Sequence, residues 1–225
     1  MKFIMKCLRG LLNLMMSDKD IKEFHNLDKL KPISLRGKST YHIMYAHDFT
    51  WGYLDNVDNE KLSKLCIKNY ENRKSEDRRS GRAEDIVIPL NKQIEEIAAQ
   101  MALAYEQHFR QPISLMEGEG NHWSQVHYKK EQSQFHHHLG NAYGQREKGA
   151  DVVGVYYVKV PKDSGVLIMK YKKHEFDSSR WYFPPEENKF ILFNAGVEHG
   201  VSPNENDEPR VIISMNFERK DDKNI

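Results

Sequence analysis

After Pro112 the chain consists of short segments that are rich in β-branched and aromatic residues. Side chains of these types fit the pleated, half-buried surface of a strand. The candidate strands are residues 123–128, 152–160, 166–171, 189–193 and 211–217. Turn residues separate them at 161–165, 184–185 and 202–209. Many short strands joined by polar turns predict a mainly β chain, folded as a sandwich or a jelly roll.

The residues before this region predict helices that flank the sheet. Residues 61–70 form one candidate helix, which Asp58 or Asn59 would cap. A clearer helix would begin at Pro89 and end near Phe109. Its apolar side chains recur at helical spacing, and they are Leu90, Ile94, Ile97, Ala98, Met101 and Tyr105. A helix with one apolar face covers the outer face of a sheet against water.

The amino-terminal segment has a helical pattern of its own. Between Phe3 and Met15 apolar residues recur at helical spacing, with basic residues elsewhere. We expect an amphipathic helix that docks on the core. The alternatives are a helix lying on a membrane surface, or a true start codon at Met15 or Met16. A secretory signal is not expected, because the segment has neither a solid apolar run nor a small-residue cleavage site.

These patterns predict four regions along the chain. They are an amphipathic helix (residues 1–20), a mixed helical preface packed on the sheet (21–110, with a possible short strand at 41–45), a double-stranded β-helix core (111–219) and a polar tail (220–225). The segment 71–82 has mixed charge and no core residue, so we expect a surface loop and a candidate lid.

Charge and cysteine content limit the classes of protein to which this chain can belong. The chain has 34 basic and 33 acidic residues, so its net charge of +1 gives no signal for nucleic acid or for a membrane surface. No stretch approaches the ~20 apolar residues of a membrane helix. Cys7 and Cys66 lie far apart and form no C-x-x-C pair. A reducing, cytoplasmic location is therefore the expectation.

Histidines provide the main chemical signal. His136, His137 and His138 stand in a row, and His199 follows much later. On an extended strand the first and third of such a row point the same way, because strand side chains alternate between faces. They can bind one metal ion together with a third ligand from a distant strand. Three protein ligands with open positions are typical of a catalytic site. His137 would point outward.

The last candidate strand has one polar and one apolar face. Its even positions are Arg210, Ile212, Ser214 and Asn216, and its odd positions are all apolar. An inward-facing guanidinium needs a partner, since an unpaired buried charge costs several kcal/mol. A carboxylate held by two parallel hydrogen bonds would satisfy Arg210. The alternative is an edge strand on which Arg210 pairs with Asp207 or Glu208 in solvent.

Taken in order, these pieces resemble the iron(II)- and 2-oxoglutarate-dependent oxygenases, in particular an uncharacterised branch found in phage and bacteria. The matching pieces are Trp123, His136-x-His138, residues 153–158 (VGVYYV), His199 and residues 210–217 (RVIISMNF). The resemblance implies a jelly roll with iron(II) on His136, His138 and His199. It also implies that Arg210 and Ser214 bind 2-oxoglutarate and that Tyr157 reaches it. The expected activity is hydroxylation of an unidentified substrate by molecular oxygen, with release of succinate and carbon dioxide.

The chain departs from the pattern of this family at two positions. The wider superfamily has a carboxylate at the first metal motif, where this chain has His138. The branch shares this histidine, and a carboxylate such as Asp151 or Glu147 is the alternative third ligand. Val153 stands where the branch prefers a serine, which leaves more of the binding of 2-oxoglutarate to Arg210 and Ser214.

The same residues are also compatible with other functions. A cupin-like three-histidine metalloenzyme without 2-oxoglutarate is one alternative, and a non-catalytic jelly-roll binding module is another. A halogenase ranks lowest, because His138 is too large to leave room for chloride. Among the remaining polar candidates, His122, His127 and His174 are expected at the surface, although His127 lies close enough in sequence to the metal motif to contact a substrate. Trp123 and Trp181 have no expected role beyond packing or lining the mouth of a pocket.

Overall fold

A computed structural model describes residues 39–44, 47–72, 85–118, 120–139, 149–174 and 177–220. Several expectations lie outside these residues, namely those for the amino-terminal helix (1–20), for Cys7, for Glu147, for most of the candidate lid (73–82) and for the tail beyond Lys220. All the described residues belong to one compact unit that spans residues 35–225.

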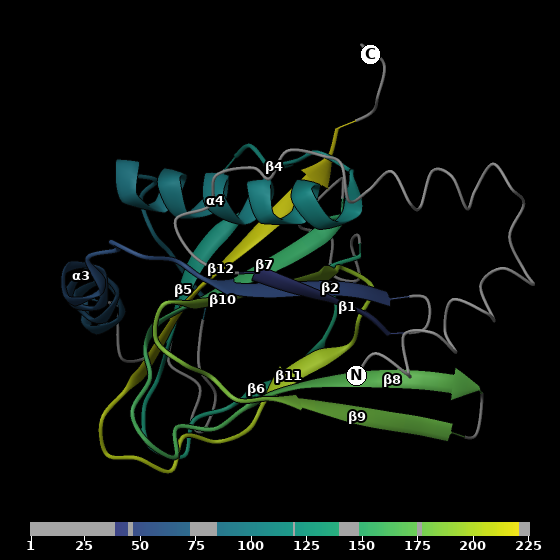
Figure 1. Ribbon diagram of the computed structural model, residues 1–225. Coiled ribbons are helices and arrows are strands. Elements are labelled where there is room, and N and C mark those ends of the chain that lie inside the picture. Colours follow the sequence, from purple (N-terminus) through teal and green to yellow (C-terminus); the bar gives the residue numbers. More distant parts are fainter. Residues whose placement is uncertain are drawn as a thin grey trace, which may run out of the picture. The chain divides into compact units, whose positions relative to one another are not determined.

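The described part of the chain contains two antiparallel sheets and two helices (Figure 1). The larger sheet has the order β1-β2-β10-β7-β12-β5-β3, and β4 pairs with β12 beside it. Its strands are β1 (Ser39–Met44), β2 (His47–Tyr53), β3 (Asp85–Val87), β4 (Ile113–Leu115), β5 (His122–His127), β7 (Val152–Lys159), β10 (Lys189–Asn194) and β12 (Arg210–Arg219). The smaller sheet has the order β6-β11-β8-β9. Its strands are β6 (Ser133–His136), β8 (Leu167–His174), β9 (Asp177–Phe183) and β11 (His199–Val201).

The strands from β5 to β12 are shared between the two sheets as in a double-stranded β-helix. Strands β5, β7, β10 and β12 lie in the larger sheet, and the strands between them in sequence lie in the smaller one. The expected fold, mainly β with flanking helices and a jelly-roll core, is confirmed. Strands β1 and β2 extend the larger sheet through pairing of β2 with β10. The possible short strand at 41–45 corresponds to β1 as far as Met44, and β2 is a further strand within the expected preface.

Two helices cover the outer face of the larger sheet (Figure 1). Helix α3 (Asn59–Glu71) begins after Asp58, whose side chain accepts from the amide of Lys61 over 3.0 Å. Helix α4 (Lys92–Phe109) begins after Asn91. The expected start at Pro89 is therefore wrong, and Leu90 is 46% exposed instead of joining the apolar face. The side chain of Asn91 accepts from two backbone amides, which stabilises the helix by ~1 kcal/mol.

Strand β12 separates two hydrophobic clusters. Its odd-numbered residues pack with the helices, and Ile212 packs between the two sheets. This agrees with the alternation expected from the sequence. The neighbouring strand β7 approaches α4 closely at Gly154, where an added Cβ would overlap Met101 and lie 2.8 Å from Phe217. Gly154 therefore serves helix-to-sheet packing.

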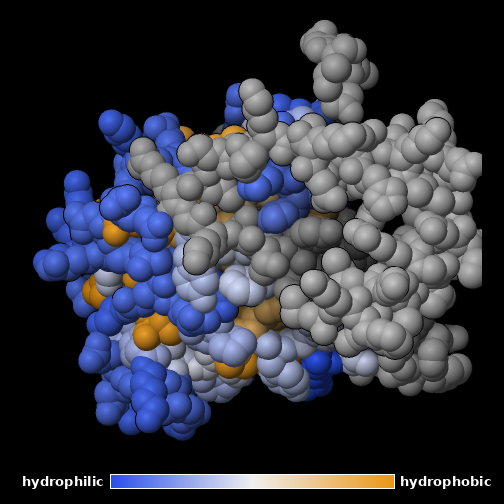
Figure 2. Space-filling model, in the orientation of Figure 1, coloured by the Kyte–Doolittle hydropathy of each residue, from blue (hydrophilic) through white to orange (hydrophobic). Residues whose placement is uncertain are grey.

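On the face seen in Figure 2, hydrophilic side chains cover most of the described surface, and apolar side chains appear in small separate areas. Of the described helices, none has the length and apolar character needed to cross a membrane.

Candidate metal centre and oxo-acid pocket

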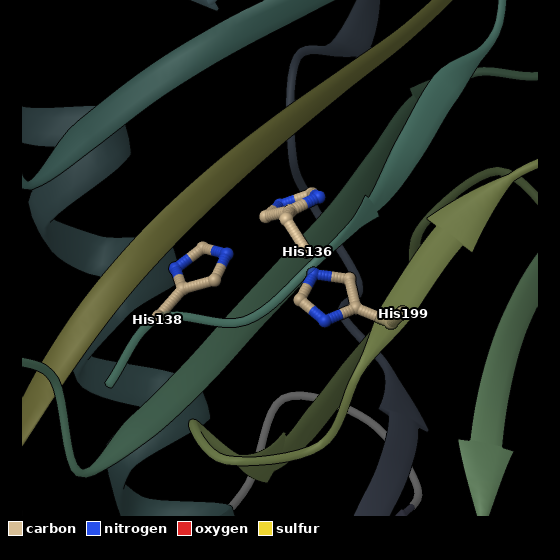
Figure 3. Close-up of side chains that lie close together, drawn as sticks. All are labelled: His136, His138 and His199. Atoms are coloured by element: carbon tan, nitrogen blue, oxygen red, sulfur yellow. The ribbon is translucent and has the colours of Figure 1, made fainter. Parts of the chain in front are cut away.

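His136, His138 and His199 form a cluster in which one ligand atom of each lies within 4.8 Å of the others. We call this cluster the histidine triad (Figure 3). His136 and His199 are direct partners in the ladder between β6 and β11. Their ring centroids are 4.4 Å apart, and that of His138 is 5.1 Å from each. The triad thus unites residues that are more than 60 positions apart in sequence.

The H-x-H segment is only partly a strand, which differs from the expectation. Strand β6 ends at His136, and His138 lies beyond it. Two backbone hydrogen bonds hold His138 in place, one from its amide to Ala195 and one from the amide of Ala150 to its carbonyl. His137 is exposed, as expected. The two ligand candidates converge because Ala195, just after β10, and Ala150, just before β7, hold the backbone of His138. Strand alternation alone does not produce the arrangement.

Each imidazole of the triad uses its Nδ1 atom in a hydrogen bond. Nδ1 of His136 lies 2.8 Å from the carbonyl of Gln134, and that of His199 lies 2.9 Å from the carbonyl of Val197. Because a carbonyl only accepts, both Nδ1 atoms carry the proton and both lone pairs are on Nε2. Nδ1 of His138 lies 2.8 Å from Oδ1 of Asn216. The donor set therefore suits a metal ion that binds neutral imidazoles.

Burial also favours the neutral form of His199, which is 5% exposed. Burial first, and then the nearby imidazoles of His138 and His136, lower the pKa of His199 well below its ordinary value. Asp151 is not part of the triad, and its Oδ2 accepts from the backbone amide of Arg219. Among the described residues, no aspartate or glutamate joins the three histidines in this cluster of possible metal ligands.

A pocket extends from the triad to Arg210 at the start of β12. Its lining includes all the residues expected to bind the co-substrate, Arg210, Ser214 and Tyr157. Trp123 lines it too and stacks on His138 with a centroid distance of 5.6 Å. Gln125 and Ser133 are polar residues that also line the pocket, and no role for them was predicted from the sequence. No sequence signal singles them out, because each is a common polar residue on a strand.

Arg210 is 1% exposed and is incompletely paired. Its Nη1 donates to the carbonyl of Ser164, while Nε and Nη2 are buried without a hydrogen-bond partner. The alternative of a solvent-exposed ion pair is wrong, because Glu208 pairs with Lys159 and Asp207 with Lys129. Burial lowers the pKa of Arg210 to about 10, so the guanidinium stays charged at neutral pH. Two unpaired donors on a buried cation are suited to a carboxylate.

Neighbouring groups shape the end of the pocket around Arg210. Gly165 has a φ of +86°, and an added Cβ would lie 2.9 Å from Nη1 of Arg210. A larger residue would therefore strain the backbone, because the carbonyl oxygens of Ser202 and Pro203 are closer still, and it would also crowd the guanidinium. Burial raises the pKa of Tyr157 to about 12, against the smaller opposite effect of Arg210, so its hydroxyl keeps its proton. Tyr157 is thus a potential hydrogen-bond donor to an anion.

Two histidines expected at the surface are buried instead. His122 is 8% exposed, and His127 is fully buried. Nε2 of His127 lies 2.9 Å from Oγ of Ser133, which donates to Gln125 over 3.3 Å. His127 is also the ladder partner of Arg210. Burial, and then the charge of Arg210, lower its pKa well below the ordinary value.

His127 is expected to make the stability of the metal-free protein depend on pH. Its pKa is depressed in the folded state, so the unfolded chain binds the proton more readily. The contribution of His127 to the free energy of unfolding is complete above about pH 6.5, the pKa of histidine in the unfolded chain. Below that pH it is lost by ~1.4 kcal/mol per pH unit. His127→Leu should therefore reduce the slope of unfolding free energy against pH on the acid side. Urea unfolding in the presence of a chelator measures this slope, and equal slopes for both proteins would contradict the assignment.

Comparisons with known proteins agree with the fold. Neither a family model nor a curated protein matches this sequence. Among solved structures, the α-ketoglutarate-dependent epimerase SnoN of nogalamycin biosynthesis aligns with a TM-score of 0.59 and 15% identity, over 75% of this chain and 76% of that one. A Pseudomonas putida prolyl-4-hydroxylase aligns with a TM-score of 0.51 and 17% identity, over 88% and 98%. A 2OG-Fe(II) family oxidoreductase from Burkholderia pseudomallei aligns with a TM-score of 0.51 and 12% identity, over 81% and 84%. The chain therefore has the fold of the 2-oxoglutarate- and iron(II)-dependent oxygenases.

Proposed function

We propose that this protein is an iron(II)- and 2-oxoglutarate-dependent dioxygenase that hydroxylates a substrate still to be identified. The observation that carries the proposal is the pairing, within one pocket, of the histidine triad with the buried guanidinium of Arg210. A metal site explains the triad alone. The unpaired Nε and Nη2 atoms of Arg210 add the requirement for an anion. The fold, which is that of such oxygenases, supports the same function.

The residues present fit both groups. His136, His138 and His199 would hold iron(II) through their Nε2 atoms, because their Nδ1 atoms are engaged in hydrogen bonds. Arg210 would bind the distal carboxylate of 2-oxoglutarate, assisted by Ser214 and Tyr157. When bound, the pair supplies oxidative decarboxylation of the oxo acid to succinate and carbon dioxide, coupled to insertion of one oxygen atom of O₂ into a C–H bond of the substrate.

The protein's own residues contribute binding, orientation and an apolar lining. The carbonyl of Ser164 accepts from Nη1 of Arg210, and Gly165 lies close to the same atom, so both limit the movement of the guanidinium. Val155, Leu167 and Ile212 line the pocket between Arg210 and the triad. This apolar wall strengthens the ion pair with a carboxylate, because the local dielectric constant is lower than that of water. His136 is exposed, so the triad is open to solvent on its side.

The proposal is tested by adding iron(II) and then 2-oxoglutarate to the anaerobic, metal-free protein. A visible charge-transfer band that requires both additions is the expected result, together with succinate formation once oxygen is admitted. Mg²⁺ and Ca²⁺ should not compete with iron, since both prefer oxygen ligands to imidazoles. Iron binding without the band would favour the cupin-like alternative. Absence of metal binding would favour the non-catalytic binding module.

A further inference from the structure

Asn216 is the centre of a hydrogen-bond chain that ends on His138. The side chain of Asn216 is fully buried on β12. Its Oδ1 lies 2.8 Å from Nδ1 of His138, and its Nδ2 donates to Oδ1 of Asn121 over 3.4 Å. Nδ2 of Asn121 donates in turn to the backbone carbonyl of Glu117 over 2.6 Å. The chain thus runs from an imidazole of the triad to a main-chain carbonyl.

The carbonyl of Glu117 determines the direction of every bond in this chain. Because a carbonyl only accepts, Asn121 must present its amide nitrogen to Glu117 and its oxygen to Asn216. Asn216 must then present its own nitrogen to Asn121 and its oxygen to His138. An amide oxygen only accepts, so Nδ1 of His138 carries the proton and Nε2 carries the lone pair. The chain therefore selects one tautomer of His138.

Backbone hydrogen bonds hold Asn121 and Asn216 side by side, so that their side chains can form this chain. The amide of Asn216 donates to the carbonyl of Asn121 over 2.8 Å, and the amide of Met116 donates to the carbonyl of Asn216 over 2.9 Å. His136 and His199, by contrast, each use a carbonyl two residues earlier in their own segment. His138 depends on a side chain that is 78 positions away in sequence. Among the three histidines, only His138 is oriented by a distant side chain.

We propose that Asn216, supported by Asn121, is the positioning residue that makes His138 a neutral metal ligand through Nε2. This inference rests on the proposed function, because it assumes that the triad holds a metal. A neutral amide accepts the Nδ1 proton without adding charge. The triad, which has no carboxylate among the described residues, therefore gains no negative charge from Asn216. Loss of a hydrogen-bond partner of this kind typically weakens metal binding by ~10–100-fold.

The test compares Asn216→Leu with a matched control, Asn204→Leu. Asn204 is equally buried, and its side chain donates to the carbonyls of His127 and Glu208, with no bond to the triad. Both variants lose a buried hydrogen-bonding amide, so both should lower thermal stability. In anaerobic Co²⁺ titrations of metal-free protein, only Asn216→Leu should lose affinity, by ~10–100-fold. Asn216→Asp, which still accepts the Nδ1 proton, should recover most of this loss.

A second readout needs no metal. In metal-free protein with ¹⁵N-labelled histidine, nuclear magnetic resonance should show His138 wholly as the Nδ1-protonated tautomer. Asn216→Leu should convert His138 at least partly to the Nε2-protonated form. Asn121→Ala, which removes only the support behind Asn216, should have a smaller effect of the same kind, and it serves if Asn216→Leu does not fold.

The outcomes separate this inference from the proposed function. If the wild-type protein does not bind Co²⁺ or iron(II), the proposed function fails. If the wild-type protein binds metal while Asn216→Leu, or Asn121→Ala in its place, retains full affinity and the same tautomer of His138, only the positioning role of Asn216 is overturned. An equal loss of affinity in Asn204→Leu would also overturn it, since the effect would then follow from destabilisation alone.

Discussion

Substitution of His199 by alanine is expected to abolish metal binding and, with it, turnover of 2-oxoglutarate. His199 is the only member of the triad from β11, and it directly opposes His136 in the ladder between β6 and β11. Its ring plane makes an angle of 51° with that of His136, and the ring packs against Phe193 with a centroid distance of 4.7 Å. Removing the imidazole removes a ligand itself, so the loss of affinity should exceed the ~10–100-fold effect of removing a ligand's hydrogen-bond partner.

Anaerobic Co²⁺ and iron(II) titrations measure this effect, and His137→Ala is the matched control. His137 stands between two candidate ligands in the same histidine row, yet its side chain is exposed and outside the triad. His137→Ala should bind metal like the wild-type protein. Affinity near the wild-type value in His199→Ala would show that the triad is not the metal site. Circular dichroism of each variant serves as the control for folding.

Substitution of Arg210 by methionine is expected to separate co-substrate binding from metal binding. Removing one member of a buried charge pair typically costs 2–5 kcal/mol, so the affinity for 2-oxoglutarate should fall by at least ~30-fold. Metal affinity should be almost unchanged, because Arg210 belongs to the far end of the pocket and makes no bond to the triad. The requirement for 2-oxoglutarate in succinate formation should therefore rise steeply.

The same substitution should make the ligand-free protein more stable. In the absence of a carboxylate, Arg210 is a buried charge with two unsatisfied donors. An apolar side chain of similar length removes this cost at the loss of one bond to Ser164, so we expect a net gain of ~1–3 kcal/mol in unfolding free energy. Denaturant unfolding without ligand measures the gain.

Arg210→Lys is the informative control for this pair of effects. Lysine keeps the charge but lacks the planar fork that binds a carboxylate through two parallel hydrogen bonds. We expect intermediate affinity for 2-oxoglutarate and no gain in stability. If Arg210→Met bound 2-oxoglutarate as tightly as the wild-type protein does, the assignment of the pocket would be wrong. A simultaneous loss of metal binding would point to a general disruption of the site.

The solved structures that align with this chain include an epimerase as well as a hydroxylase. The same fold therefore supports more than one reaction, and the outcome depends on how a substrate is placed beside the metal. For this chain hydroxylation is proposed as the general reaction of such sites.

Several parts of the fold and site could be predicted because they depend on local patterns. The alternation along residues 211–217 correctly predicted two faces of β12, since strand side chains alternate whatever lies beside them. The apolar face of α4 was correct from Ile94 onward for the same kind of reason. The start of α4 was wrong by three residues, because Asn91 caps the helix more effectively than Pro89 begins it. Strands β9 and β11 were among those missed, since β9 has many polar residues and β11 has only three residues.

The burial of His127 had no local signal. A histidine at the end of a strand is exposed or buried according to the strand's neighbours, and sequence periodicity does not identify them. Here β12 lies beside it and places Arg210 opposite His127. The hydrogen bonds of the Asn216 side chain were equally hidden, because its partners His138 and Asn121 come from separate segments of the chain.

The sequence by itself determined the residue types of the candidate site, namely three histidines and one arginine. It also determined that the last strand has two different faces. These follow from side-chain chemistry and from the two-residue period of a strand, which are local properties. The tertiary structure decided the rest. It brought His138 into the triad through backbone bonds to Ala195 and Ala150, beyond the end of β6. It also left two donors of Arg210 unpaired in the same pocket. Both outcomes depend on which strands become neighbours, and long-range packing rather than local pattern determines that.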